Sequence, residues 1–271
     1  MLKGDVTILV NTSDGFEDCW FPFFKIFKEN WKECPFPILL NTEFKEFKYE
    51  GLDVISSKVH EGIENRRLTW SECLIRGLNQ IKSPLILYLQ EDYFLTSAIE
   101  EEKLLGYIKL MQVNPQIRHI GLTNFGSRGP FSDSGFLGLK KIGQKNSYRV
   151  STQAGLWRRE TLLSLIEPYE SGWMFEIFGT KRSARKKELF LTVDPNRSEG
   201  IFSYIFTGII KGKWHTDVPE LFGKYDLYPD FNKRGFINSK NNYFQEKYLL
   251  YSKMILDPAL LLKSLRSIYV K

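Results

Sequence analysis

The most constraining feature of the sequence is a continuous apolar run, 85–89, that leads directly into the polar triplet Gln90-Glu91-Asp92. Such a run is typical of a central strand that is buried on both faces of a parallel sheet. Ligands of such sheets bind at the carboxyl ends of the strands, so the two acids lie where a ligand is expected. Their oxygens suit a hard divalent ion such as Mg²⁺ or Mn²⁺. A turn whose acids only cap the next helix is an equally good interpretation of the triplet alone.

Strand and helix patterns alternate on both sides of this run. Short β-rich segments predict strands at 6–10, 38–40, 54–55, 117–122, 148–152, 189–193 and 201–207. Apolar residues at helical spacing predict helices at 19–31, 70–81, 98–111, 156–166 and 173–187, with Thr69 capping the second. Residues 126–147 show little periodicity and predict a long loop over a ligand site. We therefore expect an α/β fold with a mostly parallel central sheet flanked by helices.

The composition excludes several classes of protein. A chain of 271 residues with 42% hydrophobic and 26% charged residues can bury a core, so disorder is not expected. Three cysteines without a CxxC pair argue against a disulfide framework or a structural zinc site, and three histidines cannot form a histidine-rich metal cluster. The sequence contains no P-loop, GxGxxG, GxSxG or HExxH motif. It also lacks a membrane-spanning stretch or a secretory leader, which predicts a cytosolic protein.

Positive charge is the main departure from an average composition. The net charge is +6, and five cations fall in the run 181–187, which is either a solvated helix end or a surface for polyanions. Residues from 243 to the end are expected to be helical, with an apolar face at 256–262 and Leu265 beside Lys263 and Arg266. This tail is expected to dock on its own domain, with an interfacial helix on anionic lipid as the alternative.

The strand at 6–10 followed by Asn11-Thr12-Ser13-Asp14, the helix at 70–81 and the strand ending in Gln90-Glu91-Asp92 together resemble nucleotide-sugar glycosyltransferases of the GT-A fold. More narrowly, they resemble the bacterial enzymes that build capsular or lipopolysaccharide chains. In that family the strand ends in an Asp-x-Asp motif whose last acid holds a metal. The resemblance implies a catalytic domain at 1–240, with a nucleotide-sugar-binding half at 1–125 and an acceptor-binding half at 126–240, and a helical extension at 241–271.

The resemblance also implies roles for individual residues. Glu176 holds the place of the catalytic acid of inverting members, and its aromatic neighbours would desolvate the carboxylate and raise its basicity. Asp92 and His215 are the implied metal ligands, for Mn²⁺ or Mg²⁺, although Gln90 replaces the first acid of the motif. The implied nucleotide-sugar contacts are Asn11, Thr12, Ser13, Arg66, Arg67, Trp70, Gln90, Glu91, Asp92 and Lys213, and the implied acceptor contacts are Gln153, Trp157 and Trp173.

The expected function is transfer of a hexosyl group from a nucleotide-diphosphate sugar to a hydroxyl of a glycan or lipid-linked glycan, inverting and metal-assisted. The expected location is the cytoplasm, with peripheral contact at the inner face of the plasma membrane and no nucleic-acid partner. A sugar nucleotidyltransferase is one alternative, but its glycine-rich, lysine-containing loop is not matched by Asn11-Thr12-Ser13-Asp14-Gly15. A non-catalytic nucleic-acid-binding module is the other, since it would explain the basic run and the aromatic content.

Overall fold

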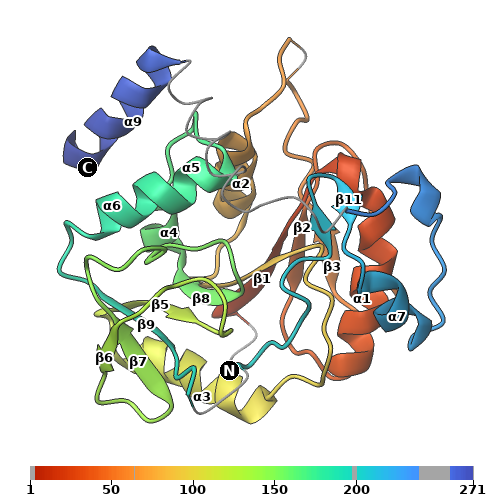
Figure 1. The fold of residues 1–271 in the computed structure, drawn as a ribbon, viewed down its shortest axis with the longest axis horizontal. Helices are drawn as coiled ribbons and strands as arrows, with labels where there is room; N and C mark the ends of the chain where they lie inside the picture. The colour runs from red at the N-terminus through yellow and green to blue at the C-terminus, as the bar shows by residue number, and fades with distance from the viewer. Residues whose placement is uncertain (1–3, 64, 197–199, 238–256, 271) are drawn as a thin grey trace.

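A nine-stranded sheet runs through the middle of the protein, in the order β3-β2-β1-β4-β8-β5-β9-β7-β6 (Figure 1). The computed structural model describes residues 4–63, 65–196, 200–237 and 257–270. The strands of the sheet are β1 (Val6–Asn11), β2 (Ile38–Asn41), β3 (Val54–Ser56), β4 (Leu85–Gln90), β5 (Ile117–Gly121), β6 (Phe131–Asp133), β7 (Leu139–Ile142), β8 (Gly155–Arg158) and β9 (Leu189–Val193). Of these strands only β7 and β8 run against the direction of the others, so the expected α/β fold with a mostly parallel sheet is confirmed.

Helices cover both faces of the sheet because its central strands are apolar on both sides. Val6, Ile8 and Val10 of β1 belong to a core that also includes residues of α1 (Glu17–Asn30), α3 (Glu101–Val113) and α7 (Val218–Gly223). Leu9 points to the opposite face, where α2 (Trp70–Gln80) and α4 (Arg159–Leu165) form a second core with Phe175. Thr69 and Glu72 form a capping box at the start of α2, as expected from Thr69.

The second half of the chain departs from the expected elements in several places. The segment 126–147 is not one long loop, since it contains the antiparallel pair β6 and β7 at the sheet edge. The expected strand at 148–152 is wrong, and the strand is β8, which begins three residues after that range, where a helix start was expected. Leu156 and Trp157 of β8 enter opposite cores, so this short strand is buried on both faces. The segment 201–207 forms only an isolated bridge between Tyr204 and Leu95.

The helix expected at 173–187 is present over a shorter range and contains an irregularity. It consists of α5 (Gly172–Met174), a π-helical segment η2 (Phe175–Gly179) and α6 (Thr180–Ser183), and the joining residues keep helical dihedral angles. A π-helical segment inside a helix is often found at a functional site. Here it contains Glu176, whose position on the helix is therefore set by local geometry that a regular period does not predict.

The C-terminal helix α9 (Pro258–Val270) docks on this helix (Figure 1). Ile268 packs with Met174 and Phe178, and Ser267 Oγ accepts a hydrogen bond from Arg182 Nη1 at 2.9 Å. The part of the expected helical tail at 243–256, and the expected boundary at 240, lie outside the described residues. No helix in the described ranges is long and apolar enough to cross a membrane.

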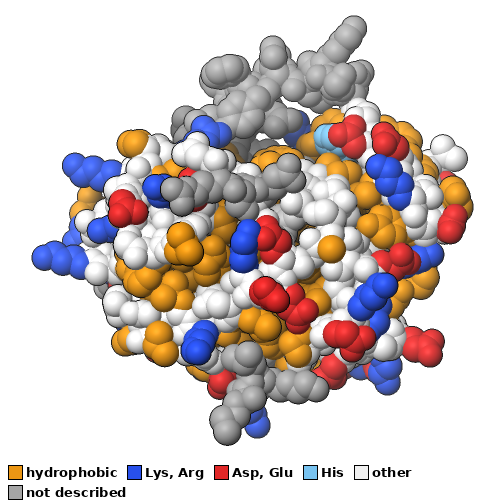
Figure 2. Space-filling model, turned by 90° about the horizontal axis from the view of Figure 1, so that it is seen from below, with side chains coloured by type: hydrophobic (Ala, Val, Ile, Leu, Met, Phe, Trp, Pro, Cys, Tyr) orange, Lys and Arg blue, Asp and Glu red, His pale blue; other side chains and the backbone are white. Residues whose placement is uncertain are grey.

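The basic run 181–187 does not form one exposed face. Arg182 is fully buried and forms an ion pair with Glu170, with 2.6 Å between Nη2 and Oε2. Lys186 donates to Ser164 Oγ at 3.1 Å, and the Arg185 guanidinium lies 4.8 Å from the centre of the Tyr269 ring. Acidic and basic side chains are also interspersed on the face shown in Figure 2. Most of this run therefore has a structural role, which weakens the nucleic-acid alternative.

Candidate functional site

A pocket of about 220 Å³ opens at the carboxyl end of β1, and we call it the β1 pocket. Its lining comes from the end of β1, the segment after β2 and the start of α2, and consists of Asn11, Thr12, Ser13, Glu43, Arg67, Leu68, Trp70 and Cys73. The structure thus brings together most of the nucleotide contacts that the sequence suggested in the first 70 residues. The carboxyl end of parallel strands is also the usual ligand position in open α/β sheets.

Hydrogen bonds from neighbouring elements hold the floor of the β1 pocket. Asn41 Nδ2 donates to Asn11 Oδ1 at 2.9 Å, and Trp20 Nε1 donates to Thr12 Oγ1 at 2.9 Å. Asn41 is completely buried, so the amide of Asn11 is fixed by a rigid partner. The polar side chains at the end of β1 are therefore positioned before any ligand binds, as is usual in small-molecule pockets.

Arg67 and Glu43 form the charged wall of this pocket. Their ion pair is loose, with 3.3 Å between Arg67 Nη2 and Glu43 Oε1, and the arginine side chain is 77% exposed whereas the glutamate is 11% exposed. An exposed arginine can turn towards an anionic ligand at low cost. Glu43 was not identified as a site residue from the sequence. It follows β2 by two residues, and an acid at this position of an α/β sheet can accept hydrogen bonds from ribose hydroxyls.

Arg66, the other expected arginine, is directed elsewhere. Both of its Nη atoms donate to the Glu72 carboxylate at 2.7 Å, and Arg66 does not line the β1 pocket. The bond from Arg66 lowers the pKa of Glu72 to about 2, and the Thr69 amide contributes to the same effect. Arg66 therefore stabilises the start of α2, and the structure does not support it as a nucleotide contact.

Asp92, the expected metal ligand at the end of β4, is buried and already engaged. Its Oδ2 accepts hydrogen bonds from the Thr207 hydroxyl and, at 3.1 Å, from the Ile209 amide. Burial raises the pKa of Asp92, whereas these donors act in the opposite direction. The Asp92 carboxylate thus holds the 207–209 segment onto the end of β4, which is a structural role that the sequence did not reveal.

Glu91 and Gln90 complete the triplet. Glu91 is buried, and burial raises the pKa of its carboxyl well above the ordinary value, with a further increase from the adjacent Asp92. Gln90 is half-buried and donates from Nε2 to the Tyr88 hydroxyl at 3.1 Å. Neither residue lines the β1 pocket.

Lys213 lies in the hairpin formed by β10 (Ile209–Ile210) and β11 (Lys213–Trp214), and His215 follows it directly. The tight turn between these strands has positive φ angles at Lys211 (53°) and Gly212 (77°). Glycine adopts such an angle easily. The backbone at this hairpin reaches the segment after β4, since Gly208 N donates to Asp92 O at 2.9 Å and Gly208 O accepts from His215 N at 2.8 Å. However, His215 Nδ1 accepts a hydrogen bond from the Asp217 amide at 3.2 Å, and Lys213 is exposed.

The described residues contain no metal site built from three protein ligands. No group of three histidine, cysteine, aspartate or glutamate side chains within these ranges is arranged to hold an ion. Asp92 uses Oδ2 for Thr207 and Ile209, and His215 uses Nδ1 for Asp217. Each of these bonds occupies only one polar atom of its side chain, so the expectation that Asp92 and His215 ligate a metal stays a prediction, and no catalytic step is assigned to a metal.

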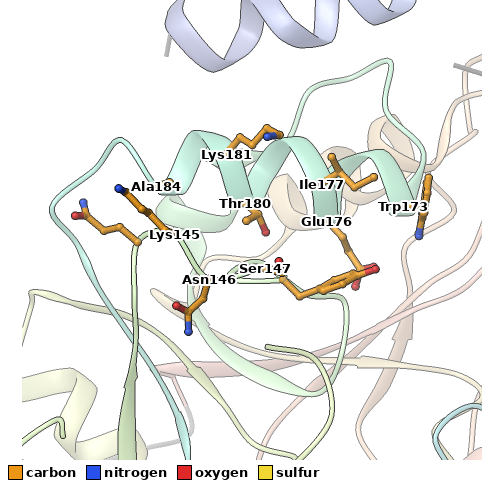
Figure 3. Close-up of a pocket in the computed structure, with 11 residues that line it drawn as sticks. Lys145, Asn146, Ser147, Trp173, Glu176, Ile177, Thr180, Lys181 and Ala184 are labelled. Carbon is orange, nitrogen blue, oxygen red and sulfur yellow. The ribbon is translucent and has the colours of Figure 1, made fainter. Parts of the chain in front are cut away.

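Glu176 lies between two adjoining pockets in the second half of the chain. The loop pocket, about 440 Å³, is lined by Asn124, Gly126, Ser127, Arg128, Tyr148, Ser151, Gln153, Trp173, Glu176 and Phe206. The helix pocket, about 390 Å³, is lined by residues 144–148 and by Trp173, Glu176, Ile177, Thr180, Lys181 and Ala184 (Figure 3). Tyr148, Trp173 and Glu176 belong to both linings, so the two pockets meet at the carboxylate.

The Glu176 carboxylate is held by one of its oxygens. Oε1 accepts hydrogen bonds from the Thr152 amide at 2.8 Å, the Thr152 hydroxyl at 2.9 Å and the Ser151 hydroxyl at 3.2 Å. Oε2 accepts none from the described residues. Burial raises the pKa of Glu176 despite these donors. A fixed carboxylate with raised basicity and one available oxygen is suited to remove a proton from a bound hydroxyl.

Two of the three expected acceptor contacts line the Glu176 pockets, and the third is buried in the core. Trp173 lines both pockets, and Gln153 lines the loop pocket while its Oε1 accepts a hydrogen bond from Tyr204 at 2.8 Å. The expectation that Trp157 contacts the acceptor is wrong. This side chain is 1% exposed, and its ring stacks on His119 with 3.9 Å between the ring centres. As a strand residue of β8 it belongs to the core and cannot touch an acceptor.

Trp70 connects the β1 pocket with the helix that contains Glu176. It lines the β1 pocket, and its ring centre lies 5.8 Å from that of Phe175, the residue before Glu176. A Cβ atom at Gly172 would lie 3.1 Å from the Trp70 ring, so a larger residue there would require the ring to shift by a few tenths of an ångström. Trp70 therefore links the wall of the β1 pocket to the helix that contains Glu176.

Comparisons with known proteins give matches among solved structures only. No protein-family model matches the chain, and no curated protein matches it. A structure of Staphylococcus aureus TarS, residues 1–349, is 12% identical with a TM-score of 0.48, and the match covers 82% of this chain and 63% of TarS. TarS 1–349 in complex with UDP is 13% identical with a TM-score of 0.44, covering 70% of this chain and 61% of TarS.

A second enzyme is also similar in structure. Glucosyl-3-phosphoglycerate synthase from Mycobacterium tuberculosis, in complex with Mn²⁺ and UDP-glucose, is 12% identical with a TM-score of 0.46, and the match covers 87% of this chain and 80% of that enzyme. This chain thus spans less than two thirds of the length of the TarS fragment and four fifths of that of the synthase.

Proposed function

We propose that this protein is a GT-A-like glycosyltransferase that moves a hexosyl group from a nucleotide-diphosphate sugar to a hydroxyl of a surface glycan. The observation that supports this proposal most is that Trp70 both lines the β1 pocket and packs on Phe175, the residue next to Glu176 in the chain. One pocket offers polar groups and an arginine for a nucleotide, and the other offers a base for a hydroxyl. A transferase with two substrates needs both at one site.

The donor binds in the β1 pocket in this proposal. Asn11, Thr12 and Ser13 contact the base and ribose, Glu43 accepts from the ribose hydroxyls, and Arg67 turns to the diphosphate. All residues that line the β1 pocket lie within the first 125 residues, whereas those of the two Glu176 pockets lie between 124 and 206. This separation supports a donor half at 1–125 and an acceptor half at 126–240.

The reaction is inverting in this proposal. Glu176 Oε2 takes the proton of the acceptor hydroxyl as that oxygen forms a bond to the anomeric carbon, and the electron pair of the breaking carbon–oxygen bond leaves on the donor diphosphate. Arg67 stabilises the charge that develops there, and Lys213 is the second candidate cation. Asp92 and His215 are the side chains that would hold a Mg²⁺ or Mn²⁺ ion, and such an ion would stabilise negative charge on the diphosphate.

We place the protein in the cytoplasm, with α9 as a peripheral contact to the inner membrane face. Leu262, Leu265 and Tyr269 form an exposed stripe on one side of this helix, at 66%, 41% and 72% exposure. Lys263 and Arg266 lie next to the stripe and match the negative charge of anionic lipid. Leu262→Ser with Leu265→Ser should reduce co-sedimentation with anionic vesicles, and unchanged co-sedimentation would contradict the contact.

A thermal-shift panel tests the donor assignment. Uridine, guanosine, cytidine and thymidine nucleotides are added with and without Mn²⁺, because a ligand that binds the native state raises the melting temperature by mass action. The proposal expects one nucleoside diphosphate to stabilise the protein selectively. Equal and small effects of all nucleotides would contradict it, and a strong salt-dependent affinity for RNA or DNA would favour the nucleic-acid alternative instead.

A further inference from the structure

Phe206 is an exposed aromatic residue on a backbone segment that is fixed on both sides of it. Its side chain is 56% exposed. The hydroxyl of the next residue, Thr207, donates to the buried Asp92 carboxylate. Two residues before Phe206, Tyr204 is buried, and its ring stacks on that of Tyr93 with 4.5 Å between the ring centres. The position of the Phe206 ring is therefore set before any ligand binds.

Phe206 lies beside the segment that holds the Glu176 carboxylate. Its ring centre is 5.3 Å from that of Phe125. The next residue, Gly126, has a φ of 97°, and a Cβ atom there would lie 2.9 Å from Ser151 Oγ, which donates to Glu176. Glycine suits this position, because the φ angle is positive and the space beside the backbone is filled. A series of contacts thus runs from Phe206 to Glu176 along the wall of the loop pocket, whose lining includes both residues.

The contact with Phe125 leaves a face of the Phe206 ring uncovered. The two rings are almost perpendicular, at 86°, so the edge of one ring meets the face of the other. If Phe125 supplies the edge, it covers one face of Phe206 and leaves the second. If Phe206 supplies the edge, Phe125 covers neither face. Since more than half of the side chain is exposed, Phe206 offers a flat apolar surface to a ligand.

Gln153 gives the loop pocket a hydrogen-bond donor of fixed direction. The Tyr204 hydroxyl accepts from the Ala154 amide at 3.1 Å and donates to Gln153 Oε1 at 2.8 Å. This pairing assigns the carbonyl oxygen of the Gln153 side chain to Tyr204, so Nε2 is the group that remains for a ligand. Together with Glu176, whose Oε2 is an acceptor, the lining contains a donor, an acceptor and an aromatic surface.

This combination matches the chemistry of a sugar ring. A pyranose has C–H groups on its faces and hydroxyls around its rim, so a face can pack on an aromatic ring while the hydroxyls bond to polar side chains. An open-chain polyol has the hydroxyls but no flat apolar face. The loop pocket, at about 440 Å³, lies within the range of roughly 300–1,000 Å³ that is usual for small-molecule sites.

We propose that Phe206 is the platform for the acceptor and that the reacting unit of the acceptor is a pyranose ring. One face of this ring packs on Phe206, one hydroxyl donates to Glu176 Oε2, and a neighbouring hydroxyl accepts from Gln153 Nε2. This inference rests on the proposed function and specifies the substrate class of the Glu176 site. It predicts that loss of the Phe206 ring weakens acceptor binding and leaves nucleotide binding unchanged.

Matched ring and open-chain probes test the inference by binding alone. The methyl glycosides of glucose, galactose, mannose, rhamnose and N-acetylglucosamine are each compared with the alditol of the same sugar, and affinities are measured by ligand-observed NMR. For at least one pair we expect the glycoside to bind about tenfold or more tightly than the alditol. No binding by any pair, or equal binding within every pair, would overturn the inference.

Variants of Phe206 assign the preference to its ring. Phe206→Ala should weaken binding of the preferred glycoside about tenfold, whereas Phe206→Trp should retain it because the indole restores a flat surface. Phe21→Ala is the control, since Phe21 of α1 is 54% exposed and lines neither of the Glu176 pockets. Melting temperatures should stay near that of the wild type in all three variants. Equal losses in the two alanine variants, or full binding by Phe206→Ala, would contradict the assignment.

Nucleotide binding is measured on the same samples to separate the two proposals. If a nucleotide still stabilises the protein and the preference for the glycoside is absent, only the acceptor inference fails. If no nucleotide binds, the proposed function fails, whatever the saccharide result.

Discussion

Replacement of Glu176 by glutamine is the sharpest perturbation of the proposed chemistry. The three donors to this carboxylate converge on Oε1 at 2.8–3.2 Å, so a glutamine can place its carbonyl oxygen there and retain all three hydrogen bonds. The amide nitrogen then replaces Oε2, the oxygen that faces the pockets. The substitution thus removes the proton acceptor and little else.

Two magnitudes follow from this geometry. Loss of a positioned general base lowers turnover by about 10²- to 10⁴-fold. Stability should not fall, because the raised pKa of Glu176 means that the folded protein favours the neutral over the charged side chain. The melting temperature of Glu176→Gln should therefore equal or exceed that of the wild type at neutral pH, with donor affinity nearly unchanged.

The assay measures turnover, melting temperature and nucleotide binding on one sample of Glu176→Gln. Glu102→Gln on α3, an exposed glutamate remote from the pockets, controls for the loss of one negative charge. Wild-type turnover in Glu176→Gln would refute the role of this residue as the base. A loss of stability without loss of turnover would make it a purely structural group, and a parallel loss of nucleotide binding would move it to the donor side.

Three further predictions follow from the same contacts. Thr152→Val removes one hydroxyl donor from Glu176, so the pKa of the carboxyl should rise and the acid limb of the pH–rate profile should move to higher pH, with the plateau at high pH retained. Glu91→Gln should raise the free energy of unfolding at neutral pH but not near pH 4. A buried acid with a raised pKa destabilises the folded state by roughly 1 kcal/mol for each pH unit between its unfolded and its folded pKa. An equal effect of the substitution at both pH values in thermal melts would refute this. Arg67→Ala should weaken nucleoside diphosphate binding by about 10- to 100-fold in calorimetry. Arg66→Ala should leave that binding unchanged, and equal losses in the two variants would contradict the assignment of Arg67 to the pocket.

The first half of the fold could be predicted because its signals are local. The apolar run before Gln90 predicts β4, and Thr69 together with the spacing of apolar residues predicts α2, which begins one residue later. Asn11, Thr12 and Ser13 could be placed at the site because they follow the first strand of a parallel sheet. Arg67 and Trp70 could be placed there because the next helix begins beside the same edge.

The second half could not be predicted because its structure depends on distant partners. β8 has four residues and is defined by its pairing with β4 and β5, so its alternation is too short to be recognised against the helix that follows it. Trp157 consequently looked like a surface aromatic residue of a helix. The same reason explains Asp92, whose partner Thr207 is 115 residues away in the chain.

Product analysis of a nucleotide-sugar incubation tests the central claim most directly. The protein is incubated with the nucleotide sugar that stabilises it, with an oligosaccharide acceptor and, separately, with pyrophosphate, and the products are followed by ³¹P NMR. The account predicts a nucleoside diphosphate and a glycosylated acceptor, since the bond that breaks joins the anomeric carbon to the diphosphate oxygen. A nucleoside triphosphate with a sugar 1-phosphate, formed with pyrophosphate, would contradict it and identify a nucleotidyltransferase, and no conversion of any nucleotide sugar would contradict both enzymatic functions.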